Sequence, residues 1–203
     1  MGVVQKIFYF HVPCAITAYL GFTVCLGGSV WYLLKGDIRA DVIARAGAEL
    51  GVLFCTAVLI SGPLWAKKAW GTFWTGEPRL LLTLVMMLIF FAYIVVRGLG
   101  GRTELTRKIG AVLAILGFAN IPLVRMSVKL WRGSHPQVVT GDGGGLDPSM
   151  VPAFLGMGGA ILLTFVALFV LRVQVGLAEE DVEVAHRALA RRARRLEDLG
   201  ASA

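Results

Sequence analysis

Hydrophobic residues fall into five long runs separated by short polar stretches. A helix that crosses a hydrocarbon core about 30 Å thick needs about 20 residues, and each run comes close to or exceeds that length. The runs cover residues 8–34, 49–66, 80–97, 109–131 and 150–174. Composition agrees, since 57% of the 203 residues are hydrophobic and 16% are charged; the mean hydropathy is +0.73. We therefore predict an all-α integral membrane protein, a bundle of five transmembrane helices.

The two ends of the chain carry different signals. Lys6 leads into the first run, which continues to Leu34 and is too long for the apolar region of a removable signal peptide, so we expect it to remain as a span. After the last run, basic residues alternate with apolar ones at near-heptad spacing, which predicts a helical cytoplasmic tail. We expect a transmembrane domain at 1–177 and this tail at 178–203.

Charge predicts the orientation. If the N-terminus lies outside, most of the 20 lysines and arginines fall on the inner side, as the positive-inside rule favours. The predicted topology is N-out and C-in. It places His11, the segment 65–79 and His135 together at the outer surface.

The segment 65–79 is predicted to be an aromatic loop. It contains Trp65, Trp70, Phe73 and Trp74, with Gly71, Gly76 and Pro78 as helix breakers. Its flat apolar surface would suit a porphyrin ring, although tryptophans also form ordinary belts at membrane interfaces. Lys67, Lys68 and Arg79 could pair with propionates or, equally, with lipid headgroups.

Two histidines lie at the outer ends of apolar segments. His11 precedes Pro13, which is best tolerated in the first turn of a helix. His135 follows the fourth run and precedes Pro136, which stops the helix. A single histidine near a helix end is more often solvated, but a pair of imidazoles is a standard axial ligand set for haem iron. His186 in the tail is expected to be exposed.

Several chemistries receive no support. The three cysteines form no C-x-x-C-H motif for covalent haem attachment and are interpreted as packing residues. No Walker-type phosphate loop is present, so ATP hydrolysis would belong to another chain. We expect neither an enzyme nor a nucleic-acid partner.

Ordered landmarks resemble the CcmC family, the haem-handling membrane proteins of bacterial cytochrome c maturation. The segment from Ile7 to Pro13 resembles the start of the family's second helix, and 62–80 resembles its tryptophan-rich "WWD" signature. Asn120-Ile121-Pro122, Ser127-Val128, His135 and Asp147-Pro148-Ser149-Met150 follow in the family's order. The resemblance covers nearly the whole chain.

The resemblance implies a site and partners. His11 and His135 would be the axial ligands of a haem b bound transiently and without covalent attachment. The platform beside them would consist of Trp65, Trp70, Phe73, Trp74, Glu77 and Arg79. The protein would lie in the bacterial inner membrane among lipids, with its site on the periplasmic side. It would deliver haem to the chaperone CcmE, and CcmA, CcmB and CcmD would complete the complex.

The chain departs from the family pattern in two places. Gly76-Glu77-Pro78-Arg79 stands where the family usually has Trp-Asp-x-Arg, so one indole is missing while the acidic charge is kept. A tryptophan at Gly76 is therefore expected to tighten haem retention. The family also has a further helix before its His-Val-Pro segment, giving six spans in place of five.

Three other functions are alternatives for a helical membrane protein of this kind. A b-type electron-transfer subunit would need histidines deeper in the spans or at both faces, and a small-solute transporter would need polar residues near the bilayer midplane. Neither pattern is present. A CcsA-like haem-delivery protein of the other maturation system stays open as an alternative.

Overall fold

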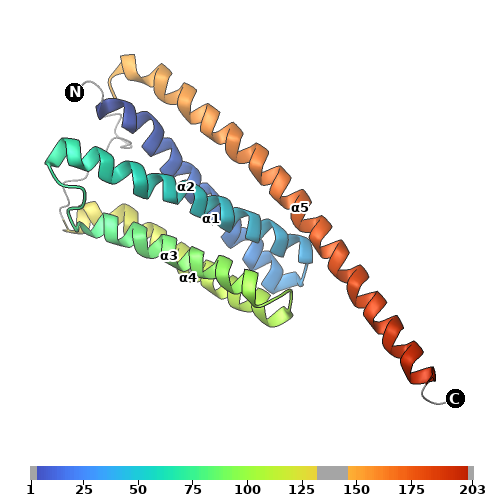
Figure 1. Cartoon of the computed structure of the whole chain (residues 1–203). Helices are drawn as coiled ribbons and strands as arrows, with labels where there is room; N and C mark the ends of the chain where they lie inside the picture. Colours follow the sequence, from blue (N-terminus) through green and yellow to red (C-terminus); the bar gives the residue numbers. More distant parts are fainter. Residues whose placement is uncertain (1–3, 132–145, 201–203) are drawn as a thin grey trace.

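The protein is a bundle of long helices (Figure 1). The computed structural model describes residues 4–131 and 146–200, and in this part of the chain all regular structure is helical. The helices are α1 (Val4–Lys35), α2 (Ile38–Trp70), α3 (Pro78–Leu99), α4 (Glu104–Trp131), the short 3-10 turn η1 (Pro148–Met150) and α5 (Val151–Gly200). Five of them are long and apolar enough to cross a membrane. The predicted five-helix, all-α membrane fold is confirmed.

The helices run up and down, so the bundle has two distinct ends (Figure 1). α1 and α2 form a central antiparallel pair, with α3 and α4 on one side and α5 on the other. We call the end where α1, α3 and α5 begin the cavity end. The opposite end, which contains the connections at 36–37 and 100–103, is called the ion-pair end.

Glycines allow α1 and α2 to approach closely. A Cβ added to Gly21 would lie 2.8 Å from the Cα of Gly51, and one added to Gly47 would lie 2.7 Å from the carbonyl oxygen of Gly21. Small residues at such a seam let two helix backbones pack together in a membrane. The rings of Phe22 and Phe90, both fully buried, stack 3.9 Å apart and fix α1 against α3.

Two helices extend well beyond the predicted spans. α2 begins at Ile38 because the carboxylate of Asp37 accepts a hydrogen bond from the backbone N–H of Arg39 at 2.9 Å and caps the helix. Because polar residues follow Asp37, the hydropathy pattern does not show that the helix begins at Ile38. α5 continues without a break past residue 177, the predicted end of the transmembrane domain, since no proline follows Pro152. Its C-terminal part projects past the other helices (Figure 1).

A buried carboxylate organises the ion-pair end. Asp41 on α2 accepts hydrogen bonds from Arg97 on α3 at 2.5 Å and from Arg107 on α4 at 2.9 Å. The side chains of Asp41 and Arg97 are only 4% and 2% exposed. Arg107 also pairs with Glu180 on α5 at 2.8 Å. One chain of contacts therefore links four helices.

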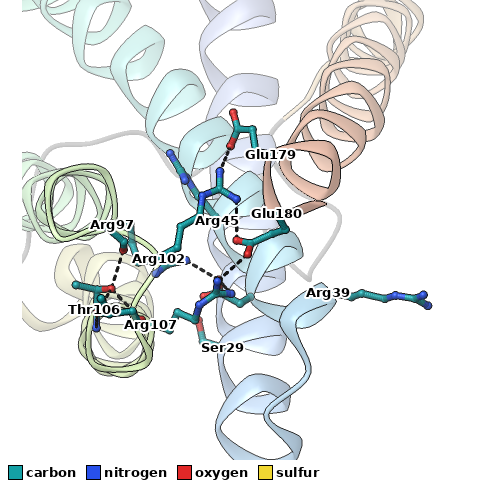
Figure 2. Close-up of polar contacts among 12 residues, drawn as sticks. Ser29, Arg39, Arg45, Arg97, Arg102, Thr106, Arg107, Glu179 and Glu180 are labelled. Carbon is teal, nitrogen blue, oxygen red and sulfur yellow. Dashed lines mark hydrogen bonds and ion pairs between the residues drawn. The ribbon is translucent and has the colours of Figure 1, made fainter. Parts of the chain in front are cut away.

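Further ion pairs fasten α5 to the same end. Figure 2 shows Arg102, from the connection between α3 and α4, facing Glu179 and Glu180 of α5, at 2.6 and 2.9 Å. Arg172 on α5 pairs with Glu49 on α2, which also accepts from Arg45 at 2.9 Å. The sequence pattern had assigned these arginines only a role in orientation, whereas the structure shows that they join helices.

Candidate functional site

A cavity of about 300 Å³ opens at the cavity end between α1, α2, α3 and the connection 71–77. Its walls are mostly apolar and aromatic, with a few polar groups. The lining comes from Ile7, Phe8, His11, Val12, Ala15, Ala18 and Tyr19 on α1; Cys55, Val58, Leu59, Gly62, Pro63, Trp65, Ala66 and Trp70 on α2; Phe73 and Trp74 in the connection; and Arg79, Leu80, Thr83 and Met86 on α3. Pockets of this character are typical of small-molecule sites.

Residues predicted from sequence meet around this cavity. His11, Trp65, Trp70, Phe73, Trp74 and Arg79 all line it, although they come from three helices and a connection. Glu77 is half-buried and does not line it. The backbone carbonyl of Glu77 accepts hydrogen bonds from the N–H groups of Leu80 and Leu81 at the start of α3.

The aromatic loop is shorter than predicted. The prediction of a loop over 65–79 is wrong at both ends, because 65–70 form the last turns of α2 and 78–79 begin α3. The helix accommodates Pro63 and ends only at Gly71, where φ is +79° and the backbone N–H donates to the carbonyl of Lys67 at 3.1 Å. Trp65 and Trp70 are therefore held on a helix, with their rings edge-to-face at 4.9 Å.

The connection forms an exposed aromatic rim. Phe73 and Trp74 are 54% and 39% exposed while they line the cavity. The ammonium of Lys67 lies 5.3 Å from the centre of the Phe73 ring and donates to the carbonyl of Gly71 at 2.9 Å. Lys67 thus stabilises the end of α2. Of the three basic residues predicted to meet propionates, Arg79 is the one that lines the cavity.

His11 is held against α2. Its Nδ1 lies 2.9 Å from the hydroxyl oxygen of Ser61, a buried residue. A Cβ added to the neighbouring Gly62 would lie 3.2 Å from Cε1 of the imidazole, so the ring packs closely on the helix. Sequence inspection missed Ser61. It lies four residues before Trp65, and this spacing places the two on one face of a helix.

The deeper part of the cavity was also missed. Tyr19, Cys55, Thr83 and Met86 line it from three helices, and Cys55 had been interpreted only as a packing residue. Their approach depends on how each helix is rotated, which a run of apolar residues does not reveal. On α4, Asn120 donates to the carbonyl of Leu82 on α3 at 2.7 Å, fastening α4 beside this wall.

The other predicted histidines have different outcomes. His135 lies outside the described residues, so its position as a ligand is not tested. The helix ends that flank it in sequence, Trp131 of α4 and Val151 of α5, both lie at the cavity end. His186 is exposed on α5, far along the chain from the cavity lining.

Comparison with known proteins identifies the family. The sequence profile described as heme exporter protein C matches residues 1–188 of this chain. The chain belongs to the CcmC family. The resemblance inferred from its ordered landmarks is thereby confirmed.

Curated members of this family share about 30% of their residues with the chain. Heme exporter protein C of Bradyrhizobium diazoefficiens is 31% identical over 169 residues, which are 82% of this chain and 64% of that protein. The Paracoccus denitrificans protein is 29% identical over 84% of this chain and 72% of its own length. The Escherichia coli K12 protein is 30% identical over 71% of this chain and 59% of its own. The chain therefore spans about two thirds of the length of these relatives.

Proposed function

We propose that this protein binds haem at the cavity end and passes it on during cytochrome c maturation, as a delivery component and not as an enzyme. The observation that carries the proposal is the gathering of His11, three tryptophans, Phe73 and Arg79 around one cavity. Family membership supports it, since relatives carry the name heme exporter protein C.

The shape and chemistry of the cavity suit part of a porphyrin. Its volume of about 300 Å³ lies at the lower end of the range for ligand pockets, about 300–1,000 Å³. A macrocycle would then be held at one side, with the remainder against the exposed rings of Phe73 and Trp74. Such a partial enclosure suits a haem b that is bound transiently and without covalent attachment.

Specific side chains would contact different parts of the haem. The imidazole of His11 would bind the iron, with His135 as the second axial ligand. The location of Trp131 at the cavity end, four positions before His135, supports this pairing. Arg79 would pair with a propionate, because guanidinium groups bind carboxylates strongly. Glu77 would act through its electrostatic interaction with Arg79 and not by direct contact.

The direction of transfer follows from the charge pattern. With the N-terminus outside, the cavity end faces the periplasm and the ion-pair end faces the cytoplasm of a bacterial inner membrane. The proposed receiver is the periplasmic chaperone CcmE. CcmA and CcmB would supply ATP hydrolysis, and CcmD would complete the assembly.

Haem titration of the purified chain tests the proposal. The full protein in detergent is titrated with haem, and absorption spectra are compared for wild type, His11→Ala, His135→Ala and the control His186→Ala. We expect each ligand variant to lose about 100-fold or more in affinity, because loss of a group that merely supports a ligand already costs about 10–100-fold. The control should match wild type. Unchanged affinity and ligand-field bands in both ligand variants would show the proposal to be wrong.

A further inference from the structure

The hydroxyl of Ser61 has two close neighbours. Its oxygen lies 2.9 Å from Nδ1 of His11 and 2.7 Å from the backbone carbonyl oxygen of Ala57, one turn earlier on α2. A third contact, to the carbonyl of Val58, is longer at 3.4 Å. Ser61 is therefore shared between its own helix and the imidazole that lines the cavity.

Proton accounting assigns the direction of both short bonds. A carbonyl oxygen has no proton to give, and two oxygens 2.7 Å apart need a hydrogen between them. The hydroxyl has a single proton, which must point to Ala57. The oxygen of Ser61 is then available to His11 only as an acceptor, so Nδ1 must carry the proton. In a neutral imidazole with Nδ1 protonated, Nε2 holds the free lone pair.

We infer that Ser61 is a positioning residue that fixes His11 as the Nδ1–H tautomer and leaves Nε2 to bind the haem iron. The tautomer follows from the hydrogen bonds alone, whereas the identity of the ligand rests on the proposed function. Metal-bound histidines usually donate their other N–H to a neighbouring group, which fixes the ring and its tautomer. Gly62 assists, because its missing side chain lets the ring lie against α2.

The chain offers a matched control for the hydroxyl. Thr56, also on α2, donates to the carbonyl of Val52 at 2.8 Å, as Ser61 does to Ala57, but its other contact is the sulfur of Met87. Thr56→Val therefore removes a comparable helix-directed hydroxyl away from His11. Ser61→Ala removes the acceptor for Nδ1, and Ser61→Thr keeps it.

Nitrogen NMR of the haem-free protein tests the tautomer directly. The full chain is labelled with ¹⁵N-histidine in detergent, and the His11 signals are identified by their loss in His11→Ala. In wild type, Ser61→Thr and Thr56→Val we expect a proton-bearing Nδ1 and an unprotonated Nε2. Ser61→Ala should give a mixed or reversed pattern. A protonated Nε2 in the neutral ring of wild type, or no change in Ser61→Ala, would overturn the inference.

Haem affinity separates this inference from the proposed function. We expect Ser61→Ala to bind haem about 10–100-fold more weakly, with altered ligand-field bands, while Ser61→Thr and Thr56→Val stay near wild type. If His11→Ala loses haem and Ser61→Ala does not, the positioning role is wrong. If His11→Ala binds haem normally while the tautomer is as expected, the proposed function fails and the hydrogen-bond assignment stands.

Discussion

The two ends of this bundle differ in how completely side chains fill the space between the helices. At the ion-pair end, Asp41, Arg97, Arg107 and Glu180 join four helices. The gap beside Asp41, Arg97 and Glu180 measures only about 10 Å³, roughly the size of one water. At the cavity end the helices enclose about 300 Å³ behind an exposed aromatic rim. Ion pairs therefore hold the helices together at one end, whereas the other end retains an open cavity.

The energetic character of the two ends differs accordingly. Buried ion pairs add little net stability compared with an apolar core, but removing one partner is costly because a charge is left uncompensated. They therefore fix how α2, α3, α4 and α5 meet. At the cavity end, Trp65 and Trp70 meet edge-to-face, and both line the cavity. Substitutions at the ion-pair end should therefore change mainly the free energy of unfolding, whereas those at the cavity end should change mainly haem affinity.

The largest effect is expected from Asp41→Asn. This change leaves Arg97 and Arg107 buried without their shared carboxylate, and we expect a loss of about 3–5 kcal/mol in the free energy of unfolding. Denaturant unfolding in detergent measures it. Haem affinity of the fraction that remains folded should stay close to wild type, since Asp41 does not line the cavity.

An exposed ion pair provides the control for Asp41. Glu104 pairs with Lys108 at 2.6 Å within α4, and both side chains are more than half exposed. We expect Glu104→Ala to leave the free energy of unfolding close to that of wild type, because an ion pair in full contact with solvent contributes little. Equal losses in the free energy of unfolding for Asp41→Asn and Glu104→Ala would show that the buried ion pairs do not hold the helices together.

A smaller effect, confined to the other end, is expected from Trp70→Ala. Removing this indole from the cavity wall should weaken haem binding about 10-fold, because tryptophans commonly dominate binding energy at partly enclosed sites. Trp131, an exposed residue at the end of α4 that is not part of the lining, is the matched control. If Trp131→Ala weakens haem binding as much as Trp70→Ala, the rings act as a general interfacial belt and not as a platform.

The smallest effect concerns Gly76 in the connection. Its φ is +71°, a conformation that costs a residue with a side chain about 1 kcal/mol. A Cβ there meets no other atom within 4 Å, so Gly76→Ala measures this strain alone. Gly76→Trp carries the same strain, and any gain in haem retention over Gly76→Ala reports stacking by the added indole. Equal retention in both variants would contradict the expectation that the missing tryptophan weakens the platform.

The parts predicted from sequence are those that local patterns determine. Bilayer thickness dictates the length of an apolar run, so five spans were evident. Topology then brought His11 and the tryptophans to one surface. The start of α2 depended on a cap at Asp37, and its end on Gly71, details that hydropathy does not resolve. Contacts such as Asp41 with Arg107, and His11 with Ser61, join residues far apart in sequence. They depend on helix rotation and therefore required the structure.

Locating the iron in the haem-loaded chain is the most direct test of whether His11 binds haem at the cavity. Crystals grown with haem, with diffraction recorded at the iron absorption edge, would give the iron position without reference to any variant. We expect iron at coordination distance from Nε2 of His11, with the macrocycle against Trp70 and its edge at the rim formed by Phe73 and Trp74. Iron found away from His11, at another face of the bundle, would contradict this expectation.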